Sequence, residues 1–172
     1  NGAALDTIPV GGVRQLVRYN NWLLVTASAA PYFRVFDMQN SYTPVFQLDD
    51  TKVRTAAEGI ALIGDTAFVA INEFGSDSGL VAISMITQDT LAVIDVGTNP
   101  NNVIAHNGQL FVQCLDYFGT DGLTVSVVDA ATLVETRRDV TGKISYGLFE
   151  LAGDEIYFQY SDFSDPALGV YS

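Results

Sequence analysis

Short apolar strands alternate with polar turns along this chain at a spacing of about 44 residues. Four polar turns each lead into an apolar strand, and their second residues are Asn21, Asp65, Gly108 and Asp154. These positions lie 44, 43 and 46 residues apart. A period of about 40 to 50 residues with several short strands per unit is typical of β-propeller blades. The pattern therefore predicts an all-β propeller of four repeats, each a four-stranded antiparallel blade.

Each repeat divides into four strands, which are recognised by β-branched and aromatic residues and by period-2 alternation. In chain order, these strands are expected to run from the innermost to the outermost position of a blade. The innermost strands are expected at 13–19, 58–63, 102–106 and 146–151, the third strands at 33–37, 80–85, 123–129 and 168–171, and the outermost strands at 43–48, 90–96 and 132–140. Residues 54–63 have helical propensity, but their place in the repeat predicts a strand. The repeats span about 13–50, 57–98, 101–141 and 143–172 as a single domain or propeller segment.

The fourth repeat stops after its third strand, and the start of the chain offers a segment of the missing kind. Residues 5–12 resemble residues 91–98, which precede the third innermost strand. Residues 4–10 are therefore a candidate closing strand, which would remove two sheet edges, and Pro9 suits an outer edge position. Two architectures remain open: a closed four-bladed propeller, or four blades of a larger ring. We favour the larger ring, since such repeats more often build larger rings.

A family resemblance is carried by residues 92–137. Residues 93–100 read Val-Ile-Asp-Val-Gly-Thr-Asn-Pro, Asn107-Gly108 forms an expected type I′ hairpin turn, and residues 125–134 read Val-Ser-Val-Val-Asp-Ala-Ala-Thr-Leu-Val. This resembles the YVTN-type repeat of surface-layer and YncE-like seven-bladed propellers, although the Tyr-Val-Thr-Asn strand itself is absent. The resemblance implies a secreted or periplasmic propeller with a binding or scaffold role. It supplies no active site, because the matched positions are structural.

The formal net charge is −12, from 20 acidic and 8 basic residues. Nucleic-acid binding requires clustered cations, so the charge argues against it, and it argues equally against anionic lipid. No window approaches about 18 uninterrupted apolar residues, so no membrane insertion is expected. The acidic composition favours solubility in salty water or outside the cell, or an acidic face that attracts a cation or a basic partner.

Three loops between second and third strands share an acidic and aromatic pattern. Their aspartates and phenylalanines recur at the repeat spacing: Asp77, Asp121 and Asp165, and Phe74, Phe118 and Phe163. In one interpretation the aspartates cap turns while the phenylalanines pack between blades. In the other, the loops form a recognition rim for a cation, a glycan or a basic protein. Asp77 and Asp121 are then the candidate calcium ligands, because Ca²⁺ prefers oxygen ligands.

The start of each innermost strand is expected to line the mouth of the central channel. Counting back from the turns places Arg14, Glu58, Asn101 or Asn102, and Tyr146 at comparable positions. A cation, a carboxylate, an amide and a phenol converging there would make a binding site for a small-molecule, glycan or protein ligand. The alternative is that they are solvated residues at strand ends.

Catalytic signals are sparse. Cys114 lies in an apolar run and is expected to be buried, and a nucleophilic role would require the single histidine, His106, as its base. No recognised catalytic signature is present, so Glu58 is the one weak catalytic candidate. We therefore predict a binding or scaffold module. The alternatives are a lactonase-like or metal-assisted hydrolase, and a structural subunit of a surface layer, filament or larger ring that another chain completes.

Overall fold

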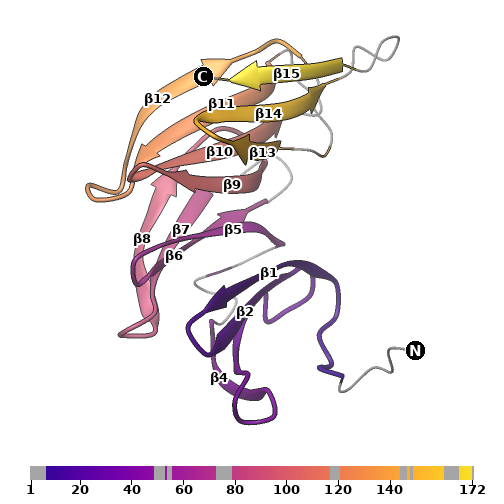
Figure 1. Cartoon of the computed structure of the whole chain (residues 1–172), viewed down its shortest axis with the longest axis vertical. Coiled ribbons are helices and arrows are strands. Elements are labelled where there is room, and N and C mark those ends of the chain that lie inside the picture. The colour runs from indigo at the N-terminus through magenta and orange to yellow at the C-terminus, as the bar shows by residue number, and fades with distance from the viewer. Residues whose placement is uncertain are drawn as a thin grey trace.

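The computed structural model describes residues 7–48, 53, 56–72, 79–116, 121–143, 147, 149–160 and 167–171. The elements of these residues are fifteen β-strands, with no helix that could span a membrane. They form four antiparallel sheets that follow one another along the chain (Figure 1). In every sheet, strands adjacent in sequence are hydrogen-bonded neighbours. The prediction of an all-β propeller built from meandering blades is confirmed.

We call the sheets blades one to four in chain order. Blade one contains β1 (Val13–Tyr19), β2 (Trp22–Ala27), β3 (Phe33–Asp37) and β4 (Thr43–Leu48). Blade two contains β5 (Ala57–Ile63), β6 (Thr66–Ile71), β7 (Gly79–Ser84) and β8 (Asp89–Asp95). Blade three contains β9 (Pro100–His106), β10 (Gln109–Asp116), β11 (Gly122–Asp129) and β12 (Val134–Val140). Blade four contains β13 (Phe149–Ala152), β14 (Glu155–Tyr160) and β15 (Ala167–Tyr171).

The turns between first and second strands depend on left-handed backbone at their first residue. Asn107 and Gly108 both have positive φ, at 48° and 78°, which fits the expected type I′ turn. In the other three turns only the first residue is left-handed: Asn20, Gly64 and Gly153 have φ values of 52°, 56° and 67°. The repeat therefore keeps the position of the turn while its type varies.

The turns between third and fourth strands are capped by the last side chain of the third strand. Asp129 Oδ1 accepts hydrogen bonds from the backbone N–H of Thr132 at 2.7 Å and of Ala131 at 3.0 Å. The bond from Thr132 is the main cause that lowers the pKa of Asp129. Asp37 accepts from the N–H of Gln39 at the equivalent place. These caps fix where each chain reversal begins.

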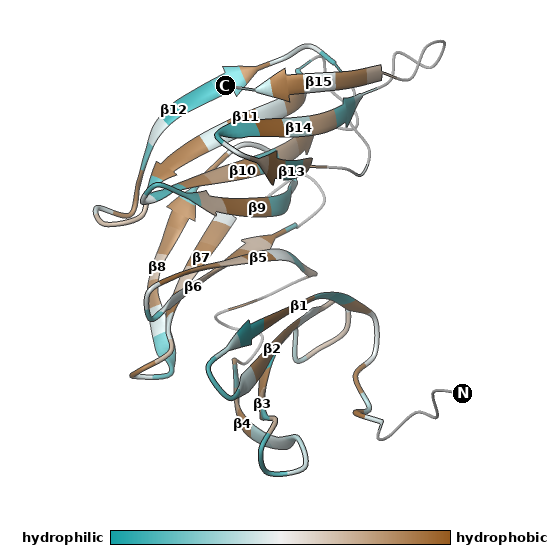
Figure 2. Ribbon diagram, viewed as in Figure 1, coloured by the Kyte–Doolittle hydropathy of each residue, from teal (hydrophilic) through white to brown (hydrophobic). Residues whose placement is uncertain are grey.

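Each hydrophobic core lies between two blades rather than within one sheet. The first cluster joins blades one and two, the second joins blades two and three, and the third joins blades three and four. Apolar residues accordingly run along the strands of the central blades (Figure 2). Cys114 is fully buried in the second cluster, as predicted.

The blades do not close into a ring, because the four sheets stack with blade one and blade four at opposite ends of the stack (Figure 1). Among the described residues, β15 pairs only with β14, and residues 7–10 belong to no strand. Arg34 Nη1 instead donates a hydrogen bond to the Pro9 carbonyl at 3.4 Å, which holds this segment against blade one. Closure by residues 4–10 is therefore not found; of these, residues 4–6 lie outside the described residues. The open stack fits the larger-ring alternative.

Candidate functional site

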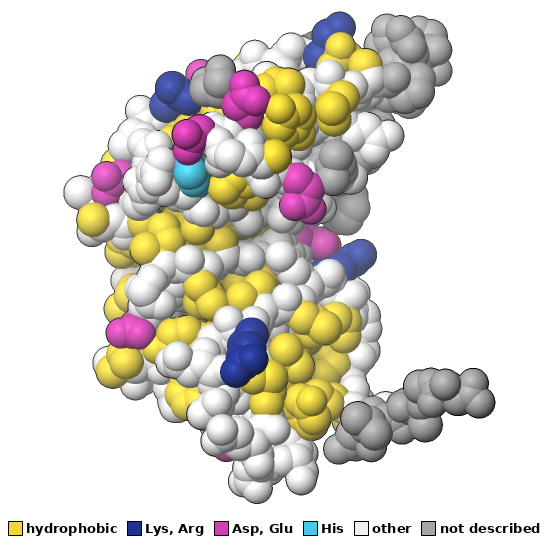
Figure 3. Space-filling model, in the orientation of Figure 1, with side chains coloured by type: hydrophobic (Ala, Val, Ile, Leu, Met, Phe, Trp, Pro, Cys, Tyr) yellow, Lys and Arg dark blue, Asp and Glu magenta, His cyan; other side chains and the backbone are white. Residues whose placement is uncertain are grey.

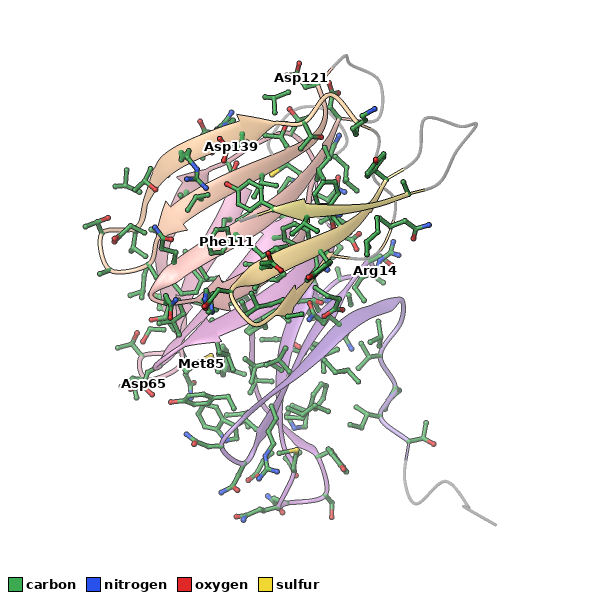
Figure 4. All side chains as sticks on the ribbon, turned by 45° about the horizontal axis from the view of Figure 1, so that its top comes forward. Arg14, Asp65, Met85, Phe111, Asp121 and Asp139 are labelled. Atoms are coloured by element: carbon green, nitrogen blue, oxygen red, sulfur yellow. The ribbon has the colours of Figure 1, made fainter. Side chains whose placement is uncertain are left out.

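The starts of the innermost strands bring three of the four predicted channel-mouth residues together. A shallow cavity of about 180 Å³ is lined by residues of β1, β5 and β9, namely Arg14, Gln15, Glu58, Gly59, Asn101 and Asn102. Arg14 lies at the edge of the molecule opposite the turn that holds Asp65 (Figure 4). Tyr146, the fourth predicted residue, lies outside the described residues. Three consecutive blades thus contribute to one site.

Glu58 and Arg14 form the charged part of this cavity. Arg14 Nε lies 3.4 Å from Glu58 Oε1, and the Glu58 side chain is 13% exposed while that of Arg14 is 48% exposed. Burial raises the pKa of Glu58, and the positive charge of Arg14 lowers it by less. The charge of Arg14 therefore offsets only part of the cost of burying the Glu58 carboxylate, which makes Glu58 a candidate for ligand binding or proton transfer.

A buried hydrogen-bond network holds the backbone of Glu58 in place. Thr26 Oγ1, which is fully buried, donates to the Glu58 carbonyl at 2.6 Å and accepts from the N–H of Gln15 at 3.1 Å. The side-chain oxygen of Gln15 accepts from the N–H of Ile60 at 2.7 Å. These bonds link β1 to β5 beside the site. The position of Glu58 is thus fixed by blade one as well as by its own strand.

Strand β9 contributes the two amide side chains of the cavity, Asn101 and Asn102. Asn102 Oδ1 accepts from the N–H of Val103 at 3.0 Å, and Asn102 Nδ2 donates to the Phe149 carbonyl at 3.5 Å. The absence of a side chain at Gly59 allows β9 to approach β5 closely, because a Cβ there would lie 2.7 Å from the Asn101 carbonyl oxygen. The glycine therefore determines how near Asn101 and Asn102 come to Glu58.

Of the acidic and aromatic loops, the structure describes Asp121. Asp121 is exposed, and its N–H donates to Asp116 Oδ2 at 3.4 Å. In the part of the chain that the structure describes, no group of three or more His, Cys, Asp or Glu side chains could hold a metal ion. The remaining loop residues lie outside the described residues: Phe74, Asp77, Phe118, Phe163 and Asp165. The recognition rim and its calcium site stay predictions.

The arrangement of Cys114 and His106 excludes a catalytic pair. Across the β9–β10 hairpin, Gln109 is the partner of His106, whereas Cys114 is the partner of Pro100, so the two lie at opposite ends. Burial raises the pKa of the Cys114 thiol to about 12. The His106 Nε2 atom lies 2.9 Å from Asp154 Oδ1 in the next blade. The nucleophile hypothesis, which required His106 as the base, is wrong.

Polar side chains also bridge neighbouring blades, which the sequence analysis did not predict. Tyr19 donates its hydroxyl to Asp65 at 2.5 Å, and His106 bonds to Asp154. In both cases the last residue of an innermost strand meets the second turn residue of the next blade. The equivalent residues of blades two and three are Ile63, which ends β5, and Gly108, in the β9–β10 turn, and neither has a side chain that can form a hydrogen bond. The repeat spacing could have indicated these bridges, because each joins the last residue of an innermost strand to the second turn residue of the next repeat.

The raised pKa of Glu58 predicts a pH-dependent difference between the wild type and Glu58→Gln. A carboxyl group whose pKa is higher in the folded than in the unfolded state binds more protons when folded. Its stability contribution is therefore greatest below the ordinary value of 4.5 and declines as pH rises through 4.5 toward the raised value. We expect the unfolding free energy of the wild type, relative to Glu58→Gln, to fall over this range in urea titrations. A constant difference would contradict the assignment.

Comparison with known proteins places the fold. No family model and no curated protein matches this chain. A hydrazine synthase of Kuenenia stuttgartiensis is similar to it with a TM-score of 0.70 and 17% identity, over 81% of this chain and 40% of that chain. The dihydro-heme d1 dehydrogenase NirN, in complex with DHE, is similar with a TM-score of 0.65 and 16% identity, over 92% of this chain and 35% of that chain. BamB from Moraxella catarrhalis is similar with a TM-score of 0.63 and 13% identity, over 85% of this chain and 39% of that chain.

The chain thus spans less than half of the length of these solved chains. At such identities the likeness concerns the fold alone. Together with the four consecutive antiparallel sheets, it shows that this chain has a β-propeller fold.

Proposed function

We propose that this chain is an extracellular or periplasmic β-propeller module that binds a polar ligand at the cavity of Arg14, Glu58 and Asn102. One observation carries the proposal: a cation, a largely buried carboxyl group and an amide from three blades line the same cavity. The acidic composition supports the location. A binding or scaffold role also agrees with the resemblance of residues 92–137 to YVTN-type repeats.

The chemistry of the cavity indicates which groups it would accept. The guanidinium of Arg14 donates hydrogen bonds, Glu58 accepts them when ionised, and the amide of Asn102 does both. A volume of about 180 Å³ holds a small polar group rather than a whole large ligand. The cavity would therefore take one unit of a glycan, or one side chain of a protein loop, while the neighbouring loops contact the rest.

Binding is tested with a panel of neutral and acidic oligosaccharides and of peptides carrying acidic or amide side chains, titrated by calorimetry. We expect Arg14→Ala and Glu58→Gln each to weaken binding about tenfold or more, because each removes a charged hydrogen-bond partner. Arg18→Ala is the matched control, since Arg18 is exposed on the face of β1 that points away from blade two. Equal affinities for Arg14→Ala and Arg18→Ala would contradict the site.

A second function, a lactonase-like hydrolase, is favoured by one observation, the raised pKa of Glu58. A carboxyl group whose pKa is raised suits general acid–base catalysis. Hydrolysis of a lactone panel, with and without Ca²⁺, separates the two functions. Turnover that is lost in Glu58→Gln would support the hydrolase. Ligand binding without turnover would leave the binding module as the function.

A further inference from the structure

The cavity at the starts of β1, β5 and β9 offers more hydrogen-bond donors than acceptors. Gln15 Oε1 already accepts from the N–H of Ile60 at 2.7 Å, which leaves its NH₂ group for a ligand. Asn102 Oδ1 likewise accepts from the N–H of Val103 at 3.0 Å. Asn102 Nδ2 donates one of its two hydrogens to the Phe149 carbonyl at 3.5 Å and retains the other. Both amides therefore favour a ligand that accepts hydrogen bonds.

Arg14 adds the charged donors of the cavity. Its Nε lies 3.4 Å from Glu58 Oε1, and in the described part of the chain no acceptor bonds to its two Nη groups. The Arg14 side chain is also the more exposed of the pair, so a ligand meets the guanidinium before it meets the carboxyl group. Neighbouring N–H groups of a guanidinium match the two oxygens of a carboxylate. Arg14 therefore favours a carboxylate ligand.

Glu58 is the one acidic side chain among the described residues that line this cavity. Within the described ranges no N–H or O–H donates to its carboxyl group, and Arg14 lies only at ion-pair distance. The neighbouring strands β2, β6 and β9 contain no Asp, Glu, Lys or Arg. Arg18 and His106 lie at the opposite ends of β1 and β9. Uptake of a proton is therefore a favourable change for Glu58, and it turns an acceptor into an O–H donor.

The charge balance of the cavity shows when an anion can bind. While both groups are ionised, Arg14 and Glu58 sum to no net charge, within a chain whose net charge is −12. A ligand carboxylate would then lie beside a second carboxylate, and like charges disfavour each other's ionised forms. A proton on Glu58 removes this repulsion and leaves the charge of Arg14 for the ligand. It also adds an O–H···O⁻ hydrogen bond, which is a strong type.

The surface around the cavity does not suit a row of anionic groups. The chain has only 8 basic residues, and on the face that Figure 3 shows the Lys and Arg side chains lie apart from one another. A polyanion requires clustered cations along its length. The arrangement therefore suits one carboxylate at one cation.

The uncharged part of the lining separates two sources of such a carboxylate. Every described residue that lines the cavity has a polar side chain, except Gly59, which has none. An Asp or Glu side chain of a peptide would bring methylene groups against these polar groups and leave some of them unpaired. A sugar acid carries a ring oxygen and hydroxyl groups close to its carboxylate, and these can accept from Gln15 and Asn102. An acidic sugar unit therefore matches the cavity better than an acidic peptide.

We propose, on the basis of the binding function proposed for this cavity, that it binds the carboxylate of one uronic-acid unit of an acidic glycan and that Glu58 takes up one proton from solvent as the ligand binds. The ligand carboxylate accepts hydrogen bonds from the Nη groups of Arg14 and from the O–H of Glu58. Gln15 and Asn102 donate to the ring and hydroxyl oxygens. One ligand carboxylate, one Glu58 carboxylate and one proton thus give a pair with a single negative charge beside Arg14.

The test is calorimetric titration with trigalacturonate and trimannuronate, each compared with its neutral methyl ester, in two buffers of different ionisation enthalpy. At a pH above the pKa of Glu58, we expect the acids to bind with uptake of about one proton per site, and the affinity to fall by up to about tenfold per pH unit. The esters should bind at least about tenfold more weakly, because they carry no charge for Arg14.

Two variants assign the proton to Glu58. Glu58→Gln should bind the acids without proton uptake and with an affinity that no longer changes with pH, because an amide does not titrate. It should bind them more weakly than the wild type does at low pH, where the wild type forms the O–H···O⁻ bond. Arg18→Ala, which lies outside the cavity, should retain both the proton uptake and the pH dependence.

Three results would overturn this proposal: acids that bind without proton uptake, esters that bind as tightly as the acids, and binding of a peptide with an acidic side chain but of no uronate. Each of them leaves a ligand in the cavity, so the binding function would stand with a different ligand class. Absence of binding by every saccharide and peptide would instead overturn the binding function itself.

Discussion

Replacing Gly59 with alanine is expected to destabilise the protein by about 1–3 kcal/mol and to open the candidate site. A Cβ at this position would lie 2.7 Å from both the Asn101 carbonyl oxygen and Asn102 Cα, and 2.9 Å from the Val103 nitrogen. All three are backbone atoms, so β5 and β9 must move apart to accommodate it. Urea denaturation should show a lower midpoint, and ligand affinity should fall because Asn102 moves away from Glu58.

Gly11→Ala provides the matched control for this prediction. Its Cβ would meet only Ala29 Cβ, at 3.6 Å, which is an ordinary van der Waals contact. We therefore expect the free energy of unfolding to change by less than about 0.5 kcal/mol. Equal destabilisation by Gly11→Ala and Gly59→Ala would show that the close approach of β5 to β9 is not the cause.

Truncation of Phe149 to alanine should cost about 3–5 kcal/mol and should act mainly on blade four. The Phe149 side chain is 1% exposed and packs with Leu115, Leu123 and Val125 of blade three. Its removal leaves a cavity in the third core cluster, which joins this blade to blade three. Hydrogen exchange should therefore accelerate most in β13, β14 and β15.

The comparison for Phe149→Ala is Val134→Ala, at a half-exposed position of β12. This change should leave exchange within blade four unaltered, because Val134 lies outside the third cluster. If Phe149→Ala instead accelerated exchange equally in all four blades, the chain would unfold as one unit. Blade four would then not be a separate cooperative element.

The repeat spacing was sufficient to predict the strands. In blade one the predicted innermost, third and outermost strands have the bounds that the structure shows, and elsewhere the ends differ by at most three residues. This succeeds because burial between blades imposes the same alternation on every repeat. The spacing also placed Arg14, Glu58 and Asn102 at equivalent positions, and the structure brings them to one cavity.

Other features depend on contacts that no periodic pattern contains. The angle between blades is set by the volumes of the side chains packed between them, so the sequence left ring closure undecided. Thr26 is fully buried although it is polar, and its role in holding the Glu58 carbonyl follows only from the three-dimensional pairing of β1 with β5. The close approach at Gly59 likewise follows from the partner strand rather than from local sequence.

The three core clusters have a consequence for how the chain folds. Because each cluster is shared by two neighbouring blades, a single blade has no interior of its own and gains little by forming alone. Stability then behaves as a sum of nearest-neighbour couplings along a one-dimensional array. Folding would begin with any adjacent pair of blades and spread to their neighbours. An insertion or loss of one whole repeat would leave the remaining couplings intact, which gives such a chain a simple route to change its number of blades.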